Sequence, residues 1–166
     1  MSQLSDLERR LAVARADFLA ALGGLPAGGA DRPMMEGWNA RDLVWHVGFW
    51  AEHGAHAIEL ALAGRGAAFD YDTGRTDAMN AAEHERGRTV SMTDALRREA
   101  AAFDRLTVAA ARLDDTTLGH RLGNGDTVAE VLAYDGPDHY AEHTAHVRSG
   151  AGAAPGNDEA GADAHT

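Results

Sequence analysis

Residues 37–46 read Gly37-Trp38-Asn39-Ala40-Arg41-Asp42-Leu43-Val44-Trp45-His46 and predict the start of a long helix. Asn39 is a favoured N-cap residue, and Asp42 places a negative charge in the first turn, where the helix dipole favours it. Apolar residues then recur at helical spacing as far as Leu62. His46 lies on or beside this apolar stripe, so the stretch predicts a core helix that carries an inward histidine.

Three more segments of the chain show helical periodicity, and none shows the sustained alternation that is typical of a strand. Ser5 with Glu8 and Thr127 with Glu130 have the spacing of capping boxes, which predicts that helices start near both. The long helices are expected over residues 2–22 (beginning at Ser2 or Ser5), 39–63, 91–113 (beginning at Ser91 or Thr93) and 127–148.

Four long helices with one longer connection describe an all-α four-helix bundle. The longer connection, residues 65–90, is polar and is expected to be a crossover between the second and third long helices, with one short helix over 77–86. The domain is expected to span residues 1–148. Residues 149–166 are rich in glycine, alanine and aspartate without periodicity, which predicts a disordered C-terminal tail.

The chain of 166 residues carries a formal net charge of −11 and contains neither cysteine nor lysine. Without cysteine, any metal site must use histidine or carboxylate ligands. The negative charge argues against binding to nucleic acid or to anionic membranes, because both attract a basic face. Residues 1–11 are unlike a signal peptide, and no apolar run reaches the roughly 18 residues of a membrane span. We therefore expect a cytoplasmic protein whose partner is a small molecule.

The last predicted helix contains histidines at two spacings that suit a metal ion. His139 and His143 are four residues apart, and His143 and His146 are three apart, so either pair can face one ion. A polar stripe on an exposed face is the alternative interpretation. Pro137 must kink or restart this helix, because it removes a backbone donor and clashes with the preceding turn. The sequence therefore leaves open which pair faces inward.

His46 is a candidate third ligand from a different helix. A buried imidazole needs a partner, which is either a carboxylate or carbonyl in a structural role or a metal ion. Trp50 and His53 lie further along the same helix and are expected to wall a pocket, with Tyr140 and His146 contributing from the last helix. The remaining histidines are expected to face solvent: His56, His84, His120 and His165.

The stretch 37–46, followed by Trp50, resembles the opening of the second helix in the DinB-like superfamily. This superfamily includes the N-terminal domain of mycothiol-dependent maleylpyruvate isomerase and the DfsB-type branch. The segment His139-Tyr140-Ala141-Glu142-His143 is similar to a segment in the fourth helix of these proteins, and 77–80 resembles their mid-chain Asp-x-x-Asn. The resemblance covers about residues 4–150.

The resemblance implies a metal-binding four-helix bundle in which His46, His139 and His143 hold one divalent ion, zinc or nickel. Several members bind the thiol of a low-molecular-weight cofactor such as mycothiol and act as transferases or isomerases on a small electrophile. Members are often dimers, so a homodimer is expected. A non-catalytic protein that sequesters small molecules, or a stress-response bundle, is the alternative. The resemblance assigns no catalytic residue beyond the metal ligands.

Overall fold

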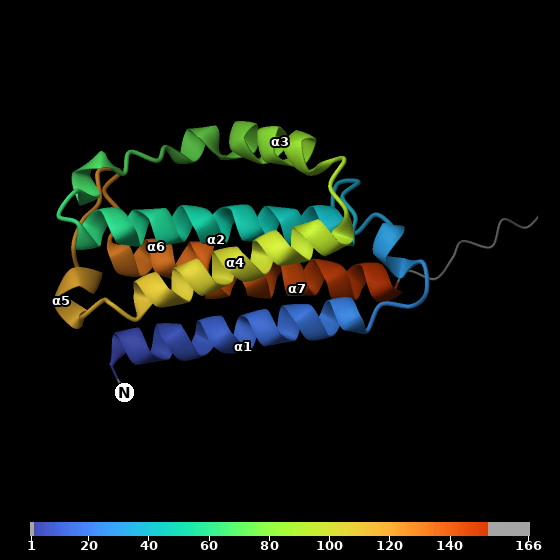
Figure 1. The fold of residues 1–166 in the computed structure, drawn as a ribbon, viewed down its shortest axis with the longest axis horizontal. Helices are drawn as coiled ribbons and strands as arrows, with labels where there is room; N and C mark the ends of the chain where they lie inside the picture. The colour runs from blue at the N-terminus through green and yellow to red at the C-terminus, as the bar shows by residue number, and fades with distance from the viewer. Residues whose placement is uncertain (1, 153–166) are drawn as a thin grey trace, which may run out of the picture.

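The computed structural model describes residues 2–152, which form a bundle of long helices (Figure 1). No β-strand occurs within this range, so the prediction of an all-α fold is confirmed. None of these helices combines the length and the apolar character that a membrane span needs. The helices are α1 (Gln3–Gly23), α2 (Ala40–Leu62), α3 (Thr76–Gly87), α4 (Met92–Ala110), α5 (Asp115–Leu118), α6 (Val128–Asp135) and α7 (Pro137–Gly152), with 3-10 turns at Gly29–Asp31, Gly66–Ala68 and Thr73–Arg75.

Side-chain caps set the starts of the long helices. The Asn39 side chain accepts a hydrogen bond from the Asp42 backbone N–H, and Asp42 accepts one from the Asn39 backbone in return. Thr127 and Glu130 form the second predicted capping box, at the start of α6. Helix α1 begins after Ser2, whose hydroxyl accepts from the backbone of Ser5, so Ser5 is not the cap.

The long helices run in two directions (Figure 1). Helix α2 packs along α4, and α1 packs along α7. In Figure 1, α2 and α4 run the same way, and the chain returns between them through residues 63–91, which contain α3. Helix α3 lies on the outside of α2 and contacts it. This arrangement places α3 and α7 where both can reach the same stretch of α2.

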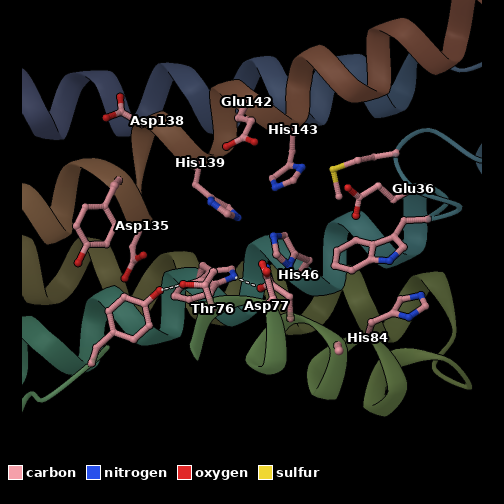
Figure 2. Close-up of a pocket in the computed structure, with 17 residues that line it drawn as sticks. Glu36, His46, Thr76, Asp77, His84, Asp135, Asp138, His139, Glu142 and His143 are labelled. Atoms are coloured by element: carbon pink, nitrogen blue, oxygen red, sulfur yellow. Dashed lines mark hydrogen bonds between the residues drawn. The ribbon is translucent and has the colours of Figure 1, made fainter. Parts of the chain in front are cut away.

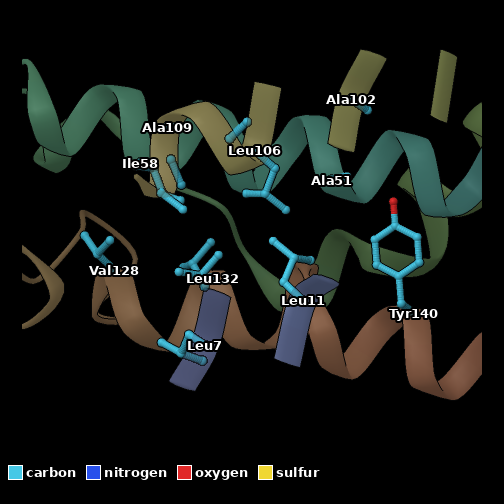
Figure 3. Packing of buried hydrophobic residues seen from close by; sticks show 14 of the residues in the cluster. Leu7, Leu11, Ala51, Ile58, Ala102, Leu106, Ala109, Val128, Leu132 and Tyr140 are labelled. Atoms are coloured by element: carbon cyan, nitrogen blue, oxygen red, sulfur yellow. The ribbon is translucent and has the colours of Figure 1, made fainter. Parts of the chain in front are cut away.

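The core lies where the long helices meet (Figure 3). Leu11 from α1, Ile58 from α2, Leu106 from α4 and Leu132 from α6 are each completely buried within it. Burying a leucine or isoleucine side chain contributes about 1.5–3 kcal/mol to folding. The core therefore holds the helices in fixed register without a disulfide.

Pro137 is the first residue of α7, where its missing N–H costs no helix hydrogen bond. Helix α6 ends at Asp135, and Gly136 forms the break between the two helices. A Cβ on Gly136 would lie 2.5 Å from the Leu132 carbonyl oxygen, so the break requires glycine. The predicted restart is what the structure shows, and everything from Pro137 to Gly152 shares one helix.

Helix α7 continues four residues beyond the predicted domain end at residue 148. The small residues there permit close packing, because a Cβ on Gly150 would lie 2.6 Å from the Cγ of Met34. The rest of the predicted tail, residues 153–166, lies outside the described residues.

A buried ion pair joins α1, α4 and α7. Arg15 donates to both carboxylate oxygens of Glu99, at 2.8 and 3.0 Å, and the Tyr140 hydroxyl donates to Glu99 at 2.6 Å. Glu99 is 1% exposed. Burial and the adjacent carboxylate raise the pKa of Tyr140, so its hydroxyl stays protonated and remains a donor.

We expect Glu99→Ala to lower the free energy of unfolding by about 3 kcal/mol, because it leaves a buried hydroxyl and a guanidinium unpaired. Urea denaturation measures the change. Glu59→Ala is the matched control, since Glu59 makes the same two-bond pair with Arg105 at an exposed site. That control should cost less than about 1 kcal/mol. Equal losses for the two variants would contradict a role for the buried pair.

Candidate metal centre

A cavity of about 710 Å³ opens beside α2, between α3 and α7 (Figure 2). A tight turn over residues 35–38, just before α2, forms one end of it and contributes Met35, Glu36 and Trp38. The volume lies within the range of about 300–1,000 Å³ that is typical of small-molecule sites.

Three histidines from two helices meet in this cavity (Figure 2). His46 comes from α2, and His139 and His143 lie one turn apart on α7. One ring nitrogen from each lies within 4.8 Å of the other two. The ring centroids are 4.8 Å apart from His46 to either partner and 4.6 Å apart between the two on α7. The structure therefore brings together the three residues that the resemblance implied as ligands.

The hydrogen bonding of these rings leaves nitrogens free for a ligand. Nδ1 of His46 and Nε2 of His139 are buried and have no hydrogen-bond partner within residues 2–152. Nδ1 of His143 shares a hydrogen bond of 3.2 Å with Nδ1 of His146, which leaves its Nε2 available. Burying a ring nitrogen without a hydrogen-bond partner costs free energy of folding, and a metal ion would provide the missing partner. Three imidazoles are a donor set that suits zinc or nickel.

All three imidazoles are neutral at pH 7, which is the form that binds a metal. Burial, together with a smaller effect of neighbouring histidines, lowers the pKa of His46 to about 4, that of His139 to about 3 and that of His143 to about 2. His46 and His143 are 5% and 2% exposed, so solvent does not offset the free-energy cost of protonating their rings. The cluster is therefore ready to accept a cation without first losing protons.

Of the four residues predicted to wall the pocket, Trp50 does line the cavity. Its indole N–H donates to the side chain of Asn80 on α3 at 3.0 Å. His53 does not line it, because its Nδ1 bonds Asp135 at 2.7 Å and its ring packs against Phe69 and Tyr71. The carboxylate of Asp135 faces the cavity in its place.

Two further residues predicted for the pocket lie elsewhere. Tyr140 follows His139 by one position, which turns it about 100° around α7 and into the core against Phe18 and Glu99. His146 does not line the cavity, and its Nδ1 shares a hydrogen bond with Nδ1 of His143. The restart at Pro137 keeps His139 on the inward face of α7. The pair that faces the cavity is therefore His139 and His143, and not His143 and His146.

Neither His84 nor Asp135 was predicted to belong to the site. His84 was expected to face solvent, but it is half-buried, lines the cavity and stacks on Trp38 with ring centroids 4.9 Å apart. Asp135 was not predicted as a site residue, but its side chain pairs with His53 in the interior and lines the cavity. Burial raises the pKa of Asp135 to about 6, and the bond to His53 opposes that rise.

A signal for Asp135 was present but weak. Gly54 was such a signal, since a Cβ there would lie 2.9 Å from the Cβ of Asp135 and would push α6 away. A glycine one residue after a histidine on a core helix indicates a close helix contact at that level. Of the other histidines expected at the surface, His56 and His120 are exposed, and His165 lies outside the described residues.

A family model described as the DinB superfamily matches residues 10–147. No curated protein and no solved structure matches the chain significantly. The matched range contains all three clustered histidines and the helices that position them. The chain therefore belongs to the DinB superfamily.

Proposed function

We propose that this protein is a metal-dependent enzyme that transfers or isomerises a small electrophile with the help of a low-molecular-weight thiol such as mycothiol. His46, His139 and His143 would hold one divalent ion, zinc or nickel. The observation that carries the proposal is the pair of buried imidazole nitrogens without partners, facing a cavity of about 710 Å³. A purely structural histidine cluster would be expected to satisfy those nitrogens internally.

A divalent cation bound at this site would favour the deprotonated, nucleophilic form of a thiol. The protein's own residues do the rest. The three neutral imidazoles fix the ion's position, and Trp50 walls the site on the side of α3. Asp135 is suited to accept the proton that an incoming thiol releases, because its pKa is raised to about 6 and His53 holds its carboxylate in place.

The alternative, a non-catalytic protein that sequesters small molecules, predicts a large apolar cavity. The cavity is not purely apolar, because its wall carries carboxylates, histidines, an asparagine and a threonine beside its aromatic side chains. Such a lining suits a site that orients a polar molecule, and it favours the enzyme over the sequestering protein.

Thermal denaturation with zinc, nickel or a chelator tests the proposal. At a metal concentration 1,000 times Kd, mass action stabilises the native state by about 4 kcal/mol, which corresponds to roughly 10 °C in Tm for a domain of this size. Adding a thiol should raise Tm further in the metal-loaded protein only. A Tm that neither metal nor chelator changes would contradict the proposed site. A metal effect that no thiol deepens would reject the thiol-dependent activity.

A further inference from the structure

The cavity wall carries an excess of negative charge. Carboxylates line it from Glu36, Asp77, Asp135, Asp138 and Glu142, whereas no arginine is among its described lining residues. The chain has no lysine that could supply a cation from elsewhere. A molecule in the cavity therefore meets no permanently positive side chain.

Two of these carboxylates have hydrogen-bonding partners. Asp138 accepts a hydrogen bond from Arg10 at 2.6 Å, and Asp135 is paired with His53. For the other three, Glu36, Asp77 and Glu142, no cationic side chain of residues 2–152 lies within 4.0 Å. Even a divalent ion on the histidines would leave a negative balance, with three charges against two.

The three unpaired carboxylates surround the histidines (Figure 2). Glu142 comes from α7 beside His143, and Asp77 comes from α3 on the opposite side of the cluster. Glu36 comes from the turn before α2. All three residues are exposed, so they stand at the mouth of the cavity while the buried histidines lie deeper. Charges of one sign around such a mouth attract ligands of the opposite sign.

Aromatic rings complete the wall. Trp38, Trp50, Tyr71 and Tyr134 all line the cavity. The face of an aromatic ring attracts a cation, and rings combined with carboxylates are a common surround for ammonium groups. These side chains surround a cavity of about 710 Å³, which leaves room for such a molecule beside the histidines.

We propose that the small molecule admitted to this cavity carries an ammonium group, held at the mouth by Asp77, Glu142 and Glu36 while its reactive end reaches the histidines. The inference rests on the proposed function, because the reactive end is taken to be a thiol, and it favours a thiol that carries an ammonium group over mycothiol, whose nitrogens are amides. The inference argues against a dicarboxylate substrate such as maleylpyruvate. Such a molecule would meet carboxylates on every side and no arginine that could bind it.

Three thiols of similar size test the charge preference on the zinc-loaded full chain by isothermal titration calorimetry. Thiocholine is positive and its quaternary nitrogen cannot bind the metal, its tert-butyl isostere is neutral, and mercaptopropionate is negative. We expect thiocholine to bind at least tenfold more tightly than the isostere, and mercaptopropionate to bind most weakly. Asp77→Asn and Glu142→Gln should each reduce the thiocholine preference severalfold, whereas Asp104→Asn, an equal charge loss at an exposed position on α4, should preserve it.

The other outcomes separate the two proposals. If all three thiols bind equally, or mercaptopropionate binds best, the charge preference is wrong while the thiol-dependent function stands. A preference that Asp77→Asn and Glu142→Gln leave unchanged would also overturn it, because thiol acidity alone would then explain the order. If zinc binds but none of the thiols does, the charge preference and the thiol-dependent function fall together.

Discussion

Replacing His143 with alanine is expected to weaken zinc binding roughly 150- to 1,000-fold. Structural zinc sites in small domains bind with about 10–16 kcal/mol from their complete ligand set, so one ligand supplies roughly 3–4 kcal/mol. The loss should appear without unfolding, because His143 makes one side-chain hydrogen bond, to the half-buried His146. Competition of the protein with a chelating dye measures the affinity, and circular dichroism checks the fold.

Two other histidines provide controls on the same scale. His146→Ala removes the hydrogen bond to Nδ1 of His143 but no direct ligand, and such outer partners typically change metal affinity by about 10–100-fold. His56→Ala, at an exposed position of α2, should leave the affinity unchanged. If His143→Ala binds zinc as tightly as His56→Ala does, the three-histidine centre is not the metal site.

Local sequence signals predicted the helices because their causes are local. Thr127 with Glu130 forms the predicted capping box, and the predicted N-cap Asn39 forms another with Asp42, each within four residues of chain. The same spacing in Ser5 and Glu8 was not sufficient, because Ser2 caps α1. The apolar stripe of α2, which is also a local signal, predicted that His46 faces the interior. The end of α4 at Ala110, three residues before the expected end, shows how much less is encoded at a helix terminus without a strong cap.

The site residues that escaped prediction depend on contacts between distant segments. Whether His53 faces the cavity depends on Asp135, which is 82 positions away and satisfies its ring from another helix. Likewise, His84 lines the cavity because α3 lies along α2, and the polar character of α3 gave no sign of that packing. Helical periodicity indicates the inward face of one helix, but not which neighbour completes a pocket.

The metal-free protein is expected to lose stability steeply in mild acid because of the same three histidines. In the unfolded chain each titrates near pH 6.5, whereas in the folded protein burial holds the pKa values at about 4 for His46, about 3 for His139 and about 2 for His143. Above pH 6.5 both states are neutral and stability does not change. As pH falls below 6.5, only the unfolded state takes up protons, so the free energy of unfolding decreases.

The size of this effect follows from the number of protons. Three protons taken up by the unfolded state give a slope of up to about 4 kcal/mol per pH unit, or about 6 kcal/mol lost between pH 7 and pH 5. Asp135 acts in the opposite direction, because its folded pKa is raised to about 6 and protonating it favours the folded state by about 1 kcal/mol at pH 5. A net loss near 5 kcal/mol is comparable to the whole stability of many domains.

Urea denaturation of the chelator-treated protein at intervals from pH 7 to pH 5 measures the slope. His46→Gln cannot titrate, so we expect it to reduce the slope by about a third, whereas His120→Gln, at an exposed position, should leave the slope unchanged. An identical slope for His46→Gln and the unmodified chain would show that the histidine cluster is solvated rather than buried. In the metal-loaded protein the ligands stay neutral to about pH 4, so acid should release the ion through unfolding and not through direct protonation of the site.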